Sequence, residues 1–388
     1  MESESIVFSI FLIFTGAAVV STFALFGRQP LIVGYILLGG LFGPYGLDLV
    51  SDSETLEHIS HIGIVFLLFL LGLDLQPRNF GKLIGRSALV TITSGVILCL
   101  LGTLICQQFG FSWLESGVVG LSLMFSSTII GIKLLPTTML HHKHTGEVLI
   151  AVLLIQDILA IVLLILLSGT EHIGDLGAWL GVGIALPGLL LGARYLVRWV
   201  IMPLLVKFDR FHEYIFLLAI GWCLGMAELA EALNLSREIG AFVAGISLAN
   251  GPIAQYIATH LKPLRDFFLI LFFFSIGAGF NLGLVDDIWL PSLLITGLVL
   301  VLKPVLHAKL LRTVGESKPL AWEAGFRLGQ TSEFSLLIAF IASAQGLIGV
   351  VAAHVIQATT ILTLLLSTYI VVFRYPTPIA LSDRLRRD

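Results

Sequence analysis

Apolar stretches of about 20 residues recur along the whole chain and are separated by short polar loops. A stretch of this length crosses a bilayer as one helix, because a helix satisfies its own backbone groups in lipid. We count about thirteen such spans. Their approximate limits are 6–26, 30–49, 57–75, 85–108, 113–135, 146–168, 177–203, 212–232, 238–252, 263–284, 288–311, 321–344 and 349–373. The sequence therefore predicts an all-α polytopic membrane protein, with residues 1–388 forming a single membrane transport domain.

Composition supports this class of protein. The chain is 57% hydrophobic and 12% charged, whereas soluble domains are about 25% charged. A net charge of −3 gives no reason to expect nucleic-acid binding. The three cysteines all lie in apolar runs, which argues against a disulfide framework or a zinc site.

Charged residues alternate between the two ends of successive spans. Basic residues gather on one side, at 28, 78–86, 143, 194–210, 262–265, 309–318 and 384–387. Acidic residues gather on the other side, at 2–4, 52–57, 115, 171–175 and 286–287, with Arg237 as a basic exception. Because basic loops mark the cytoplasmic side, we expect a periplasmic N-terminus and a basic cytoplasmic tail over residues 374–388.

Short motifs recur at an offset of about 205 residues, which indicates an internal repeat. The pairs are Gly43-Pro44 with Gly251-Pro252, Gly72-Leu73-Asp74-Leu75 with Gly279-Phe280-Asn281-Leu282, Ser126-Ser127-Thr128 with Thr331-Ser332-Glu333, and Ile155-Gln156-Asp157 with Ile356-Gln357-Ala358. They are displaced by an odd number of spans, so the two copies cross the membrane in opposite senses. This predicts six-helix inverted repeats over about 6–168 and 212–373, joined by a linker helix over about 177–203, an arrangement typical of secondary transporters.

Asp157 is an ionisable residue at the centre of an apolar span. A charge at that depth costs roughly 2.5–3.5 kcal/mol on insertion scales, so it indicates function. Because burial disfavours the ionised carboxyl, Asp157 can hold a proton or a monovalent cation in turn, which is the minimal chemistry of antiport. Gln156 beside it offers a neutral carbonyl oxygen to a cation. The structural alternative is a buried Asp that joins helices through hydrogen bonds.

Lys303 lies near the middle of the span 288–311 and precedes Pro304, which locally frees backbone groups. Close to Asp157, its ammonium would supply a countercharge while the site is empty. The alternative is a lysine that extends to the cytoplasmic interface.

Two polar islands interrupt apolar spans at equivalent places in the two repeats. They are Ser126, Ser127 and Thr128 in the first repeat, and Gln330, Thr331, Ser332 and Glu333 in the second. Such stretches are typical of broken helices, which supply carbonyls and hydroxyls to a cation. For Glu333, direct ion binding and a structural ion pair, with Arg327 as the candidate partner, both stay open.

Two further groups of polar residues lie near the expected cytoplasmic side. Asp74 ends a predicted helix there and either lines a cytoplasmic funnel or pairs with Arg78. His141, His142 and His144 favour a solvated loop cluster over a metal site or a pH sensor.

Several motifs together resemble the monovalent cation:proton antiporter-2 family, particularly its Kef-type potassium-efflux branch, over essentially all 388 residues. These motifs are Gly34-Tyr35 through Gly43-Pro44, Leu70-Leu71-Gly72-Leu73-Asp74, Phe125-Ser126-Ser127-Thr128, Gln156-Asp157, Lys303-Pro304 and Gln330-Thr331-Ser332-Glu333-Phe334. The resemblance implies a homodimer in the bacterial inner membrane, with two broken helices that cross next to Asp157. Potassium-type relatives carry Gln-Asp where sodium-type relatives carry two acids. One carboxylate favours electroneutral exchange of one K⁺ for one H⁺.

Two departures from the Kef pattern matter. The chain has no glycine fingerprint of a nucleotide-binding domain. Either a cytoplasmic regulatory domain or subunit is missing from it, or it is a naturally short member of the branch. The loop at 259–266 is basic where gated relatives are acidic, which argues against glutathione gating. We expect no cofactor beyond the transported ions. A Na⁺/H⁺ antiporter of the same fold and a cation channel are the alternatives; an intramembrane enzyme is disfavoured, because no histidine lies mid-span near Ser126 or Ser127.

Overall fold

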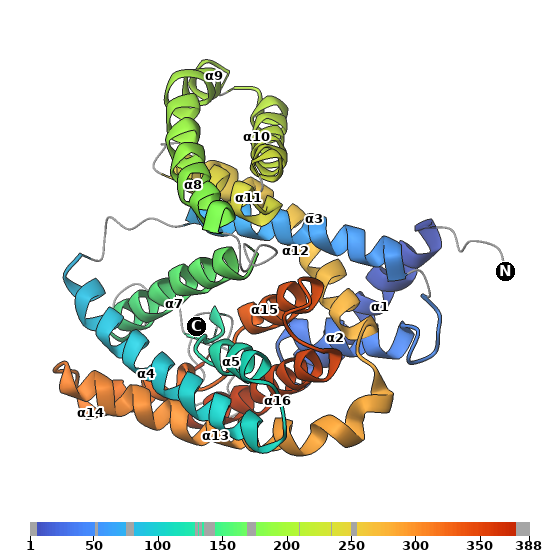
Figure 1. The fold of residues 1–388 in the computed structure, drawn as a ribbon, viewed down its shortest axis with the longest axis vertical. Coiled ribbons are helices and arrows are strands. Elements are labelled where there is room, and N and C mark those ends of the chain that lie inside the picture. Colours follow the sequence, from blue (N-terminus) through green and yellow to red (C-terminus); the bar gives the residue numbers. More distant parts are fainter. Residues whose placement is uncertain are drawn as a thin grey trace. The chain divides into compact units, whose positions relative to one another are not determined.

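The computed structural model describes residues 6–50, 53–74, 81–128, 131, 134–135, 144–168, 176–208, 210–233, 235–249 and 254–377. Its helices are α1 (Ile6–Phe26), α2 (Leu31–Phe42), α3 (Ser53–Asp74), α4 (Gly81–Gln108), α5 (Trp113–Ser122), α7 (His144–Ser168), α8 (Leu176–Leu196), the π-helical η4 (Val197–Ile201), α9 (Met202–Lys207), α10 (His212–Ala232), α11 (Arg237–Ala249), α12 (Ala254–Ala278), the 3₁₀ turn η5 (Leu282–Leu284), α13 (Val285–Thr313), α14 (Lys318–Arg327), α15 (Glu333–Ala344) and α16 (Val350–Arg374). They are drawn in Figure 1.

These helices confirm the all-α polytopic class. Within the described part of the chain, seven helices are long and apolar enough to cross a membrane. Shorter apolar helices cover 31–42, 61–73 and 333–344. Each of the thirteen expected spans coincides with helical residues of the structure. The spans expected at 113–135 and 321–344 are each interrupted at a polar island, so neither is one continuous helix.

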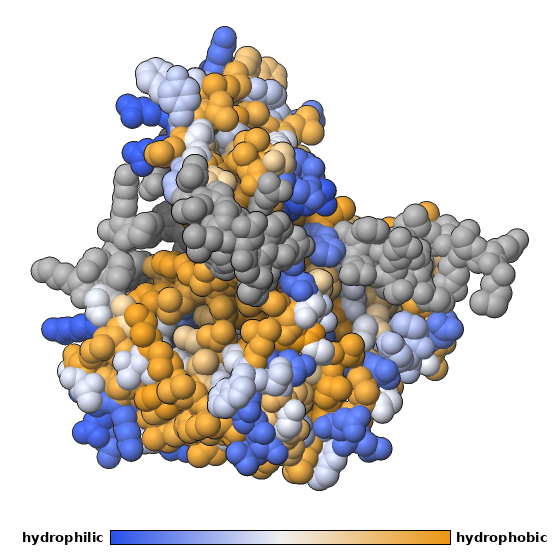
Figure 2. Space-filling view, viewed as in Figure 1, coloured by the Kyte–Doolittle hydropathy of each residue, from blue (hydrophilic) through white to orange (hydrophobic). Residues whose placement is uncertain are grey.

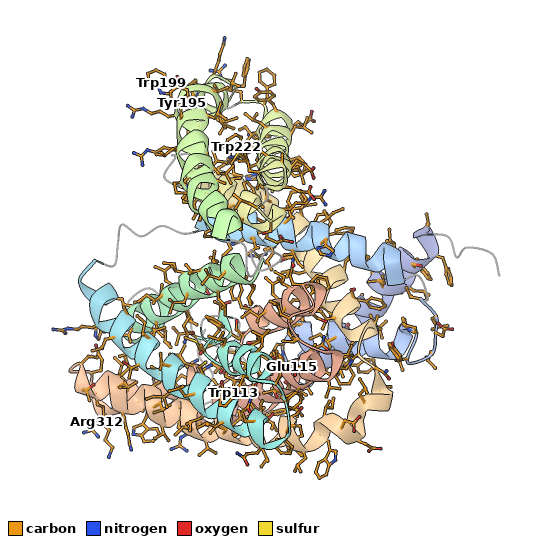
Figure 3. All side chains as sticks on the ribbon, viewed as in Figure 1. Trp113, Glu115, Tyr195, Trp199, Trp222 and Arg312 are labelled. Atoms are coloured by element: carbon orange, nitrogen blue, oxygen red, sulfur yellow. The ribbon has the colours of Figure 1, made fainter. Side chains whose placement is uncertain are left out.

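The outward-facing residues are largely apolar, as a lipid environment requires. Phe23, Leu100 and Val301 are exposed, and hydrophobic residues cover much of the face drawn in Figure 2. Tyr195 at the end of α8 and Trp199 in η4 lie together, with ring centroids 6.3 Å apart (Figure 3). Arg198 lies over the Trp199 ring. Aromatic and basic side chains of this kind mark the level of the lipid headgroups.

The chain divides into two compact units. Unit 1 comprises 1–14, 48–79 and 165–275, and in it α11 packs against α3, α8 and α10. The α3–α11 contact requires glycine, because a Cβ at Gly72 or at Gly245 would meet the main chain of the other helix. Small residues allow this close approach of two helices in a membrane. Trp222 of α10 adds a bond from its Nε1–H to the Ala244 carbonyl (3.2 Å).

Unit 2 comprises 15–47, 80–164 and 276–388 and contains the candidate site. Here α13 packs against α4, α14 and α16, while α15 packs against α5 and α16 (Figure 1). Gly325 lets α14 approach the main chain at Pro304 of α13. The limits of the two inverted repeats and of the linker helix stay predictions.

Candidate ion-binding site

Both polar islands interrupt helices. α5 ends at Ser122, and residues 123–127 are not helical. α14 ends at Arg327, and α15 begins at Glu333 after the non-helical residues 328–332. The second broken helix is therefore confirmed. For the first, the break is described, but most of the segment that follows it lies outside the described residues.

The two breaks cross and bind each other. Ser126 of the first break donates from Oγ to the Leu328 carbonyl of the second (2.9 Å). In the opposite direction, Ser335 of α15 donates from Oγ to the Ser122 carbonyl at the end of α5 (2.6 Å). These carbonyls have lost helical partners, so the crossing satisfies groups that lipid could not.

Lys303 of α13 binds both breaks with a single ammonium group. Nζ donates to the carbonyls of Leu123 (2.9 Å), Phe125 (2.6 Å) and Gln330 (2.9 Å). An ammonium has three N–H donors, so all of them are used. The side chain is 0% exposed, which rules out extension to the interface. Its role as a countercharge to Asp157 stays a prediction.

Gln156 of α7 also binds the first break. Its Oε1 accepts from the Ser126 N–H (3.0 Å), and its Nε2 donates to the Met124 carbonyl (3.3 Å). The amide therefore positions the main chain on both sides of Phe125. Contact with a cation would use the second lone pair of Oε1.

Asp157, one residue further along α7, differs from these neighbours. It is 8% exposed, and within the described residues its carboxylate has no hydrogen-bond or ion-pair partner. A buried carboxylate without a partner is costly, so this group is suited to take up a proton or a cation.

The remaining polar side chains of the second break attach it to α16. Gln330 donates from Nε2 to the Ser127 carbonyl (3.3 Å) and accepts from Ser367 Oγ (3.0 Å). The hydroxyl groups of Thr331 and Thr363 share a hydrogen bond of 2.7 Å. Their burial keeps the break in a fixed shape.

Glu333 and Thr128 join the two breaks directly. Thr128 donates from Oγ1 to Oε1 of Glu333 (2.9 Å). Ser332 is the N-cap of α15 and accepts from the Phe334 N–H (3.2 Å). Glu333 is thus held at the start of a helix and bonded to the first break.

Arg327 and His307 are buried residues whose contacts sequence reasoning missed. Arg327 does not pair with Glu333; it binds Glu323 (3.0 Å), four residues earlier on α14. That i,i+4 spacing was the signal that could have revealed the pair. His307 lies 2.9 Å from the Lys303 carbonyl through Nδ1 and 3.5 Å from Ser94 Oγ through Nε2.

Of the other predicted residues, most lie outside the described part of the chain, and His144 lies at the start of α7. Asp74 ends α3, but its side chain, like Arg78, lies outside the described residues. His141 and His142 lie outside them too. His144 begins α7 and contacts the carboxylates of Glu147 (3.1 Å) and Glu316 (3.0 Å).

Comparison with known proteins decides the family. The model of the transmembrane sodium/hydrogen exchanger family matches residues 10–374. The chain belongs to the sodium/hydrogen exchanger family. This is a family of membrane transporters rather than of enzymes.

Curated relatives of this exchanger include potassium-efflux proteins. It is 32% identical over 317 residues to the glutathione-regulated potassium-efflux system protein KefC of Salmonella typhi, and 32% identical to that of Salmonella arizonae. Each match covers 79% of this chain and 50% of the relative, so the exchanger spans about half the length of the curated relatives it matches. These matches confirm the resemblance to the Kef-type branch.

Solved structures confirm the fold of the exchanger. The sodium proton antiporter MjNhaP1 from Methanocaldococcus jannaschii, at pH 8, has a TM-score of 0.69 and 16% identity, over 93% of this chain and 94% of that one. An electron-microscopy structure of the same antiporter has a TM-score of 0.67 and 17% identity, over 95% of both chains.

Proposed function

We propose that this exchanger is a secondary active antiporter that exchanges a monovalent cation, preferably K⁺, for H⁺ across the bacterial inner membrane. The observation that carries the proposal is the Asp157 carboxylate. It is buried beside two crossing helix breaks and has no partner among the described residues, whereas the polar groups around it are bonded. At such a site the proton and the transported monovalent cation compete for the same carboxylate.

Competition between the proton and the cation at Asp157 sets the ratio in which the two are exchanged. When Asp157 is protonated it has no charge to offer a cation, and when a cation binds, the proton has left. The occupied site carries the same net charge in both forms. One cation therefore exchanges for one proton, and no charge crosses the membrane in a full cycle. The Lys303 ammonium is bonded to main-chain carbonyls in each break, so it moves with the site and adds nothing to the transported charge.

The choice of K⁺ rests on the Gln156-Asp157 pair and on the relatives. The two KefC relatives are named potassium-efflux proteins, and MjNhaP1 is named a sodium proton antiporter. K⁺ holds its water less tightly than Na⁺, so an uncharged amide beside one acid suits it better than a second adjacent acid would. Na⁺/H⁺ exchange on the same site is the alternative.

We propose that the exchanger works as a homodimer and by alternating access, with the crossing breaks moving as one body. The N-terminus is periplasmic and the C-terminus cytoplasmic in this scheme, following the distribution of basic loops.

Flux measurements in liposomes test the proposal. The purified chain is reconstituted, and proton movement is recorded with a pH-sensitive dye after addition of K⁺, Na⁺ or Li⁺ across a range of pH. We expect K⁺-driven proton flux that does not depend on membrane voltage and is lost in Asp157→Asn. Flux that survives Asp157→Asn contradicts the carrier role, and K⁺ flux without proton movement indicates a channel.

A further inference from the structure

Arg327 is the last residue of α14 and lies directly before the second break. Its side chain is 0% exposed. Nε and Nη2 donate to Oε1 of Glu323 (3.1 and 3.0 Å). Nη1 donates to the Leu134 carbonyl (3.0 Å), and Nη2 donates to the Pro376 carbonyl (2.8 Å). One guanidinium therefore joins three parts of unit 2, which are α14, the chain beyond the first break and the segment that follows α16.

The two bonds to main-chain carbonyls go beyond what an ion pair within α14 requires. Pairing with Glu323 at i,i+4 spacing needs only one cation on the same helix, which a lysine also provides. Leu134 and Pro376 are instead 193 and 49 residues away in sequence. A planar guanidinium carries its donors in a rigid fork and so holds several acceptors at set positions. Arg327 thereby fixes where two distant segments lie relative to the start of the second break.

The segment that follows α16 also packs against α14 through its side chains. Arg327 lies over the Tyr375 ring, 6.0 Å from its centroid. In the reverse direction, Arg374 lies over the Phe326 ring at 5.1 Å. Such cation–π contacts are favourable, and most so where water is excluded. Thr377, at the end of this segment, is 0% exposed. The segment is therefore packed into the same unit as the two breaks.

A short series of contacts leads from Arg327 to the transport carboxylate. The next residue, Leu328, accepts at its carbonyl from Ser126 Oγ of the first break (2.9 Å). The Ser126 N–H donates to Oε1 of Gln156 (3.0 Å). Gln156 directly precedes Asp157 in α7. A displacement of Arg327 therefore shifts the groups that hold the first break beside Asp157.

We propose that Arg327 is a positioning residue of the transport site, which fixes the second break to the chain beyond the first break and to the segment that follows α16. The inference rests on the proposed antiport function, in which the crossing breaks move as one body. Arg327 keeps the crossing in one shape during that movement, so Asp157 offers the cation the same surroundings throughout the cycle. The guanidinium acts through the main chain and binds no transported ion.

Liposome flux of matched variants separates positioning from a purely structural role. Arg327→Gln removes the fork that holds the Leu134 and Pro376 carbonyls. We expect its K⁺ concentration for half-maximal flux to rise about tenfold, the change that corresponds to losing one charge-assisted hydrogen bond. Arg327→Lys keeps the charge but not the fork, so its value lies between those of wild type and Arg327→Gln.

Glu323→Gln is the matched control, because it removes the ion pair and leaves the donors to both carbonyls in place. We expect this variant to unfold at a lower temperature in detergent and to keep the K⁺ dependence of wild type. Loss of stability and loss of positioning are then measured separately.

A K⁺ dependence like that of wild type in folded Arg327→Gln would overturn the inference and leave the antiport proposal intact. An equal shift in Glu323→Gln would also overturn it, since the ion pair rather than the carbonyl bonds would then be responsible. An unaltered chain without cation-driven proton flux would instead contradict the antiport proposal.

A cross-link covers the case in which Arg327→Gln does not fold. Because Arg327 binds main-chain carbonyls, Leu134→Cys combined with Pro376→Cys keeps both bonds. With the three native cysteines replaced by alanine, propanediyl bis-methanethiosulfonate joins the two new thiols, and mass spectrometry verifies the product. We expect the cross-linked protein to keep its K⁺-driven proton flux, because the two segments stay together during transport. Loss of flux that a reducing agent restores would show that the segments move apart, which contradicts the inference.

Discussion

Replacing Lys303 by methionine tests whether its ammonium holds the two breaks together. Methionine fills a similar volume but donates no hydrogen bond. Three carbonyls, from Leu123, Phe125 and Gln330, then lose their shared donor inside the protein. A hydrogen bond to a charged group contributes roughly 1.5–3 kcal/mol, and a carbonyl left buried without a partner costs about 1–3 kcal/mol.

These contributions are not additive, because the crossing relaxes once the lysine is gone. The measured loss for breaking a buried charged network is about 3–5 kcal/mol, and we expect Lys303→Met to fall in this range. Burial of the lysine charge itself carries a cost that methionine removes, so the lower end is the safer expectation. In a chain of 388 residues, about 3 kcal/mol corresponds to a fall of about 4 °C in Tm.

Thermal unfolding in detergent, followed by circular dichroism, measures this change. Lys309→Met is the control, because Lys309 lies on the same helix and is exposed; its Tm is expected within about 1 °C of wild type. Lys303→Arg keeps the charge but not the compact ammonium, so it recovers part of the stability. An unchanged Tm in Lys303→Met, with an altered pH profile of transport, would refute the idea that Lys303 holds the two breaks together. It would favour a purely electrostatic role for the ammonium.

Three further substitutions probe other contacts. Gln156→Glu places a carboxylate against a main-chain carbonyl to which the amide donates; we expect a loss of about 1–3 kcal/mol, seen as a lower Tm in detergent. Arg327→Lys cannot keep the two bonds to Glu323 together with the bond to the Pro376 carbonyl. Limited trypsin digestion should then cut faster near the C-terminus, and equal rates would contradict the contact. Gly245→Leu forces a side chain into the main chain of α3, so we expect aggregation on size-exclusion chromatography, whereas Gly188→Ala, which faces open space, elutes like wild type.

The spans could be predicted from the sequence because the bilayer sets their length. Every expected span has a helical counterpart, although single helix ends differ, as at α12, which begins at Ala254 rather than 263. The breaks were predictable for a related reason: Ser126-Ser127-Thr128 and Gln330-Thr331-Ser332-Glu333 are polar where lipid demands apolar residues. Both the spans and the breaks can be recognised from hydropathy within one stretch of sequence. Neither prediction requires knowing which segments contact each other.

The partners of the polar side chains were not predictable in this way. Lys303 contacts carbonyls at positions 123, 125 and 330, and the sequence gives no local sign of such distant main-chain acceptors. Its depth in the span suggested a charge beside Asp157 instead. Gln156 likewise reads as an ion ligand next to an acid, but its amide bonds the first break. The roles expected for Lys303 and Gln156 at the ion stay predictions. Their contacts with the breaks were missed because side-chain direction depends on the crossing of two segments, which residue spacing does not encode.

The contacts of Gln156 explain why an amide suits this position better than a carboxylate. The side chain at 156 must accept from the Ser126 N–H and donate to the Met124 carbonyl. An amide does both, whereas a carboxylate can only accept and would face the carbonyl with like partial charge. In this geometry the side chain at position 156 holds the first break in place. The neutral amide of the Gln156-Asp157 pair therefore has a structural role that a carboxylate at the same position could not fill.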